Sequence, residues 1–154
     1  MGERPKITPE KLLEYAFIWD EAKNEWVTAY RRDWRRQKTV TFVDEVTFNA
    51  SVTTYTSDVY EVAPYANFLL LVNLDVTGTP TDIYINVQFS DDGATWYKYM
   101  RGPFGDLRWE DTAGDKMECI DGPILAKYMR LYLVASGTAA NATFKMTVKA
   151  ILNG

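Results

Sequence analysis

The stretch Asn67–Trp96, NFLLLVNLDVTGTPTDIYINVQFSDDGATW, decides the fold class of this chain. It opens with an apolar run, Phe68–Leu74, which is too short to span a membrane and is typical of a strand covered on both faces. Apolar and polar residues then alternate strictly over Ile83–Phe89, as in a strand with one buried face. Ser90–Gly93 predicts a tight turn and Thr95–Tyr99 the returning strand. We therefore expect a β-meander at the centre of a sandwich.

The same signals recur along the chain, where short apolar or alternating segments are separated by Gly and Pro turns. They predict further strands at Thr39–Val43, Val46–Thr56, Val59–Val62, Lys116–Ile120, Lys127–Ala135 and Asn141–Leu152. In the last of these, the even-numbered residues from Ala142 to Leu152 are expected to face inward. Met100–Lys116 is the exception, a long loop rich in Gly, Pro and Asp. The sequence predicts an all-β fold, an antiparallel β-sandwich of jelly-roll type over residues 39–154.

Residues 1–38 are expected to form an extension of this sandwich. Thr8-Pro9-Glu10 has the residue order of a helix start. Tyr15–Trp19 and Glu25–Tyr30 predict a hairpin whose tip, Asn24, tolerates a left-handed backbone. A basic strap, Arg31–Lys38, completes the extension.

Composition limits the partners of the chain. Its 154 residues are enough for one sizeable core. The net charge is −4, but the strap holds five basic residues against Asp33, a net of +4, which leaves −8 for the rest. An acidic body would repel nucleic acid, so we expect the strap to meet an acidic protein surface. Without a signal-peptide pattern or an apolar run of membrane length, the chain is expected to be made in the cytoplasm, with no membrane partner.

The residue types argue against catalysis. The chain has no histidine and a single cysteine, Cys119, which removes the usual nucleophile–histidine pairs and the imidazole zinc sites. Carboxylates remain, and two could face each other as in a glycosidase or hold calcium through oxygen ligands. The candidates for either role are Asp106, Glu110, Asp111, Asp115, Glu118 and Asp121, and Asp91 with Asp92 is a further candidate pair for calcium alone. Since they follow no recognisable spacing, we expect solvated loop charges, no enzyme activity, no cofactor and no metal.

Several segments, taken in order, resemble a group of small virion proteins of tailed bacteriophages. These segments are Ile18–Asp20, Glu25–Val27, Ser57–Val62, Asn67–Val72, Thr79–Thr81, Ile85–Trp96, Ala126–Leu131 and Thr143–Val148. The resemblance implies a β-sandwich or jelly roll that is usually oligomeric and serves in head decoration, head–tail joining or the tail. It supplies no catalytic residues.

The function expected from this resemblance is capsid decoration. The chain would bind the major capsid protein on the virion surface as a symmetric oligomer, with a trimer favoured by analogy. The expected anchors combine arginine with aromatic residues, as protein contacts often do: Trp19, Trp26, Tyr30, Arg31, Arg32, Trp34 and Arg35. Trp19 and Trp26 could instead close the core. The alternative is a receptor-binding or carbohydrate-binding module that uses Tyr99, Phe104 and Trp109.

Overall fold

The computed structural model describes residues 17–20, 24–28, 37–100, 107–110 and 114–154, and every regular element in them is a strand. The strands are β1 (Phe17–Asp20), β2 (Glu25–Thr28), β3 (Gln37–Phe48), β4 (Thr54–Thr56), β5 (Tyr60–Glu61), β6 (Asn67–Thr77), β7 (Asp82–Ser90), β8 (Tyr97–Lys98), β9 (Leu107–Glu110), β10 (Lys116–Pro123), β11 (Tyr128–Ser136) and β12 (Thr143–Asn153). Within these ranges there is no helix long and apolar enough to cross a lipid bilayer.

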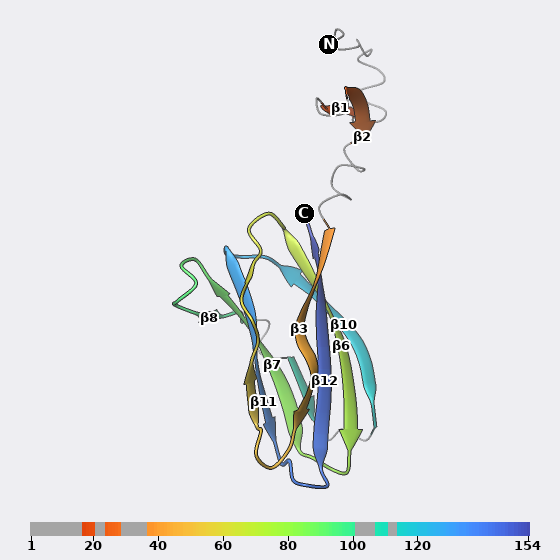
Figure 1. Ribbon diagram of the computed structural model, residues 1–154, viewed down its shortest axis with the longest axis vertical. Helices are drawn as coiled ribbons and strands as arrows, with labels where there is room; N and C mark the ends of the chain where they lie inside the picture. The colour runs from red at the N-terminus through yellow and green to blue at the C-terminus, as the bar shows by residue number, and fades with distance from the viewer. Residues whose placement is uncertain (1–16, 21–23, 29–36, 101–106, 111–113) are drawn as a thin grey trace.

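Strands β3 to β12 form two antiparallel sheets packed face to face (Figure 1). The four-stranded sheet has the order β10-β6-β12-β3, and the larger sheet has the order β4-β11-β7-β8, with β5 on β11 and β9 on β7. Apart from β7 to β9, the chain crosses to the opposite sheet at nearly every connection. This alternation is the strand order of a jelly roll, so the predicted sandwich type is confirmed.

The core lies between the two sheets and follows the predicted alternation. In β7, Ile83, Ile85, Val87 and Phe89 are at most 5% exposed. In β12, every even-numbered residue from Phe144 to Leu152 is buried, as is Ala142 just before the strand. Strand β6 supplies Phe68, Leu70, Val72 and Leu74 to the same layer. Every second residue is therefore buried along β6, β7 and β12, which is the pattern expected when each sheet has one face on the core.

The structure differs from the expected strand boundaries at two places. Thr39–Val43 and the start of Val46–Thr56 form one strand, β3, because Glu45 at φ 48° makes an irregularity in the pairing with β12 instead of a break. The predicted second strand ends early because the Asn49 side chain accepts hydrogen bonds from the backbone of Ser51 and Val52, turning the chain toward β4. The predicted loop Met100–Lys116 contains a further strand, β9.

The predicted amino-terminal hairpin is present as β1 and β2, with Asn24 at φ 52° in the turn. Residues 1–16, including the expected helix start, lie outside the described residues. So does most of the basic strap; its last two residues, Gln37 and Lys38, begin β3.

Candidate interaction site

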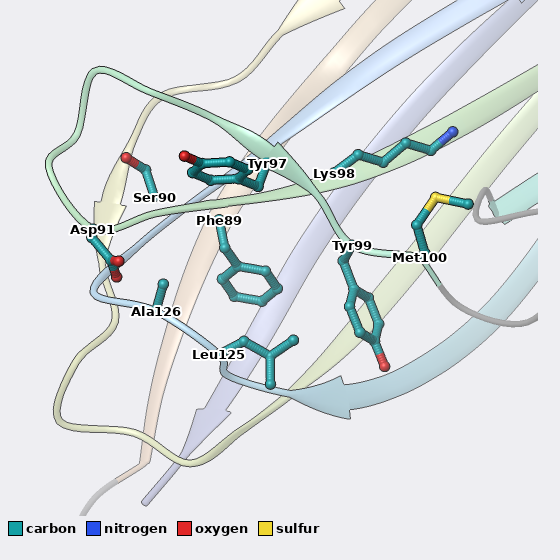
Figure 2. A pocket seen from close by; sticks show the side chains of 9 residues that line it. All are labelled: Phe89, Ser90, Asp91, Tyr97, Lys98, Tyr99, Met100, Leu125 and Ala126. Atoms are coloured by element: carbon teal, nitrogen blue, oxygen red, sulfur yellow. The ribbon is translucent and has the colours of Figure 1, made fainter.

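A hollow of about 340 Å³ opens at the β8 edge of the larger sheet (Figure 2). Register places Tyr97 opposite Phe89, and the Tyr99 backbone N–H donates to Val87 O at 2.7 Å, which holds this short edge segment against β7. Tyr99 meets the Phe89 ring edge-on at 6.1 Å between centroids. The opposite wall is Leu125 and Ala126, from the connection between β10 and β11.

The lining of this hollow is largely apolar and unusually exposed. The exposed fractions are 67% for Tyr97 and 60% each for Met100 and Leu125. Three large apolar side chains gathered at one opening form a patch of the kind that marks a contact site on a soluble protein. The residues that line the hollow are Phe89, Ser90, Asp91, Tyr97, Lys98, Tyr99, Met100, Leu125 and Ala126.

Beside the hollow, the outward face of the larger sheet carries an arginine held by two uncharged groups. The Arg130 guanidinium carbon lies 4.2 Å from the centre of the Trp96 ring, and Arg130 Nε donates to Gln88 Oε1 at 2.8 Å. Register puts Lys98, Gln88 and Arg130 in one row across β8, β7 and β11. Neither Trp96 nor Gln88 neutralises the arginine. Arg130 is therefore a fixed cation on this face that suits a carboxylate of a partner.

A second arginine on the same face has a different environment. Arg108 lies 5.4 Å from the centre of the Tyr84 ring, close to two carboxylates. Its Nη1 lies 3.3 Å from Glu110 Oε1, and its Nε lies 3.8 Å from Asp82 Oδ2. These acids offset the charge of Arg108, whereas Arg130 is held by the uncharged Trp96 and Gln88.

The turn between β7 and β8 places Trp96 and Tyr97 next to the hollow. Asp92 Oδ1 accepts hydrogen bonds from the backbone N–H of Thr95 at 2.7 Å and of Ala94 at 2.8 Å, and from the Ser90 hydroxyl at 2.9 Å. The Thr95 and Ala94 bonds, followed by the Ser90 bond, hold the pKa of Asp92 well below its ordinary value of 3.8. Gly93, at φ 76°, completes the turn.

This turn predicts a pH-dependent contribution to stability. Because the folded state lowers the pKa of Asp92, the ionised carboxylate stabilises the fold at pH above 3.8, and that contribution is lost as the pH falls below this value. We expect Asp92→Ala to lower the melting temperature by a few degrees at pH 7, with a smaller difference from the parent at pH 2. Calorimetry of the parent and of Asp92→Ala between pH 7 and pH 2 measures this difference in melting temperature. Asp91→Ala, at the neighbouring exposed position, is the control, and an equal loss there would contradict the assignment to Asp92.

The residues predicted as anchors from the sequence lie mostly outside the described structure. Tyr30, Arg31, Arg32, Trp34 and Arg35 fall there entirely. Trp19 and Trp26 are Cα partners across the β1–β2 hairpin. The interaction predicted for these residues stays a prediction.

The alternative loop residues are divided by the structure. Tyr99 lines the hollow, and Phe104 lies outside the described residues. Trp109 is only 7% exposed and donates its indole N–H to Glu118 Oε2 at 2.9 Å. Its ring belongs to the core, and this position gives a sugar no face to stack on. The described acidic residues bring no group of three or more metal-ligating side chains together.

The sequence reasoning did not select Trp96, Tyr97, Met100, Leu125 or Arg130 as contact residues. The alternation in β11 is enough to predict that Arg130 faces outward. Its contact with Trp96 depends on the register between β11 and β7 and on the turn after β7, which alternation alone does not give.

No protein-family model matches this chain, and no curated protein sequence matches it. The chain is similar to several solved structures. The PBSX exported protein XepA matches 88% of this chain and 43% of its own, with a TM-score of 0.52 and 10% identity. The SPBc2 prophage-derived protein YomS matches 77% of this chain and 93% of its own, with a TM-score of 0.43 and 14% identity. The structure of the infectious bursal disease virus Gx strain matches 77% of this chain and 32% of its own, with a TM-score of 0.49 and 9% identity.

At these identities the likeness concerns the fold. The chain spans less than half of the XepA chain and about a third of the bursal disease virus chain. The XepA match covers 88% of this chain, with a TM-score of 0.52.

Proposed function

We propose that this chain is a non-catalytic structural protein of a tailed-phage virion, which decorates the assembled head as a symmetric oligomer. The observation that carries the proposal is the surface at the β8 edge, where an apolar hollow adjoins an arginine stacked on tryptophan. Aromatic residues, methionine and arginine are the residue types enriched in protein interfaces. The fold shared with XepA and the resemblance of the sequence to phage virion proteins support the same function.

The amino-terminal extension is proposed to reach neighbouring subunits on the head. Extended contacts of this kind tie one subunit to the next, so that each contact helps to retain the others. The sandwich begins with β3 at Gln37, and a chain starting there keeps every strand of both sheets.

Co-sedimentation with empty heads tests this function. We expect the full chain to pellet with expanded heads from the source phage, and a variant lacking residues 1–36 to remain in the supernatant while keeping its β-sheet circular dichroism. Full chain that stays in the supernatant would contradict head decoration. Equal pelleting of the variant that lacks residues 1–36 would contradict only the proposed role of the extension and would leave head decoration standing. Gold-labelled antibody on intact virions should mark heads, and labelling confined to tails would also contradict decoration.

A binding module for carbohydrate or a receptor is the second candidate, supported by the exposed Tyr97 ring beside Tyr99. Sugar rings commonly stack on such aromatic faces. A glycan array probed with the full chain separates the two functions. A binding module predicts a glycan signal that Tyr97→Ala abolishes, whereas head decoration predicts no such signal.

A further inference from the structure

The edge strands of the two sheets differ in how well they are protected from pairing with another chain. An unpaired strand edge is a template for a further strand, and short strands or irregular pairing are the usual protection against it. The edge strands of the larger sheet, β4, β5, β8 and β9, have only two to four residues each. In the four-stranded sheet, β3 has twelve residues, but its pairing with β12 is shifted between Met146 and Val148 and again between Val148 and Lys149.

Strand β10 has neither kind of protection. It has eight residues and pairs with β6 from Lys116 to Pro123 without a register shift. Its proline, Pro123, is its last residue. In the part of the chain that the structure describes, β10 pairs with β6 alone, and it lies at the margin of the sandwich (Figure 1). We name the side of β10 that faces away from β6 the β10 edge.

The hydrogen bonds to β6 determine which main-chain groups lie along the β10 edge. The Ile124 N–H donates to Ala66 O at 2.8 Å, directly after the strand. Successive residues of an antiparallel strand direct their main-chain groups to alternate sides, so the even-numbered residues of β10 bond to β6. The N–H and C=O groups of Met117 and Cys119 therefore point away from β6. Both residues are exposed, so a further strand can reach this edge.

The chain also contains a pair of strands that belongs to no larger sheet. Strands β1 and β2 form a two-stranded sheet, and within the described residues they pair with no strand of their own sandwich. An isolated two-stranded hairpin is at best marginally stable in water, and further strands stabilise it. A single copy therefore has a hairpin without a neighbouring strand and a long regular edge without one.

We propose that the β1–β2 hairpin of one copy adds to the β10 edge of a second copy and extends its four-stranded sheet. This inference rests on the homo-oligomer of the proposed function. One contact between copies gives a neighbour to both the hairpin and the edge. Residues 29–36 join Thr28 to Gln37 and can extend to about 28 Å, which allows the hairpin to leave its own sandwich. Each copy gives one hairpin and offers one edge, so the contact is heterologous and closes into a ring around a symmetry axis.

The lengths of the strands limit the register of this contact. A strand of four residues, such as β1 or β2, directs the main-chain groups of two residues to each side. It can therefore bond to two successive outward residues of β10. Cys119 is the middle residue of Met117, Cys119 and Asp121, so its main chain is bonded in either register. Main-chain hydrogen bonds provide the affinity in such strand additions.

Hydrogen exchange at single amides, measured by NMR, tests the contact. The Cys119 N–H should exchange at least about tenfold more slowly in the assembled full chain than in the variant lacking residues 1–36. Ile120 is the internal control, because its N–H bonds to β6 and should be equally protected in both proteins. Unchanged exchange at Cys119 would overturn the proposal, and protection that persists without residues 1–36 would assign the edge to a different strand.

Two substitutions at Cys119 separate a main-chain contact from a side-chain contact. Cys119→Pro removes the outward N–H at a position where an edge strand tolerates proline, whereas Cys119→Ala removes the thiol and keeps the N–H. In sedimentation equilibrium, Cys119→Pro should raise the self-association Kd by about tenfold or more, and Cys119→Ala should leave it unchanged. Equal Kd values for the two variants would overturn the main-chain contact. Circular dichroism verifies folding, and the exchange comparison decides the question independently of whether Cys119→Pro folds.

The sole cysteine also allows the neighbouring segment to be identified. Cys119 is exposed, so a maleimide that carries a photoreactive benzophenone can be attached to it in the full chain. Irradiation should cross-link β10 to peptides that contain β1 or β2. Mixing ¹⁴N-labelled and ¹⁵N-labelled copies shows by mass spectrometry whether the two peptides come from different copies. Cross-links confined to one copy, or to peptides outside the hairpin, would overturn the proposal.

The oligomeric state separates this contact from head decoration. A full chain that stays monomeric at high concentration but pellets with empty heads would overturn the contact between copies and leave head decoration standing. An oligomer with the expected exchange and cross-links that does not pellet with heads would support the contact and contradict head decoration.

Discussion

Phe144→Ala is expected to lower the free energy of unfolding by about 3–5 kcal/mol, the usual cost of removing a buried aromatic ring. Phe144 is fully buried in β12, the strand between β6 and β3. Its Cα partners are Phe48 on one side and Val76 on the other. Phe48 is also fully buried, so loss of the neighbouring ring would leave a cavity that a rigid pair of sheets cannot readily close.

Denaturation in guanidinium chloride, followed by tryptophan fluorescence, measures this loss. A small domain has only about 5–15 kcal/mol in total, so the variant would be marginal at 37 °C. Lys145→Ala, on the exposed face of the same strand, is the control and should change stability by less than about 0.5 kcal/mol. A loss below about 1 kcal/mol for Phe144→Ala would show that this part of the core is not tightly packed.

Gly78→Ala is expected to cost about 3 kcal/mol or more, because two penalties coincide at one position. Gly78 adopts φ +69° in the turn between β6 and β7, a conformation that alanine rarely takes. An added Cβ would also lie 2.1 Å from the backbone oxygen of Asn141 in the connection before β12. That oxygen belongs to the main chain, so the clash is relieved only if one of the two connections moves.

Gly114→Ala separates the two penalties. Gly114 has φ +95°, but a Cβ there meets nothing within 4 Å. Its substitution should cost only the backbone strain, about 1 kcal/mol. The excess measured for Gly78→Ala then reports the close approach of the two connections. Equal losses at Gly78 and Gly114 would mean that these connections separate without cost.

The sandwich could be predicted because its strands alternate cleanly. Ile83–Phe89 and the even positions of β12 face the core as their pattern indicates. The boundary of β3 was missed because Asp44 and Glu45 interrupt the apolar pattern, yet the strand absorbs them in an irregular pairing with β12. Strand β9 was missed because its four residues follow Gly102, Pro103 and Gly105, which indicate a loop.

The interaction site was less predictable for a physical reason. Trp109 is a residue type that often binds ligands, and its burial together with the bond from its indole N–H to Glu118, on another strand, shows that it is a core residue. Arg108 and Arg130 are equivalent in sequence terms, since each is an arginine on an outward strand position. Asp82 and Glu110 lie beside Arg108 and offset its charge, whereas neither acid pairs with Arg130. Such contacts depend on strand register, which acts between residues far apart in the chain.

The start of β3, the first strand of the sandwich, lies beside the end of β12, the last strand, and this arrangement determines how the sandwich responds to a mechanical force. Gln37 and Asn153 are register partners, and their side-chain amides are joined by a hydrogen bond of 3.1 Å. A force that pulls residue 37 away from residue 153 acts across the ladder of β3 and β12, so it opens one rung at a time. Tension delivered through both ends would therefore peel this sandwich apart, whereas tension delivered along a strand would have to shear many rungs at once.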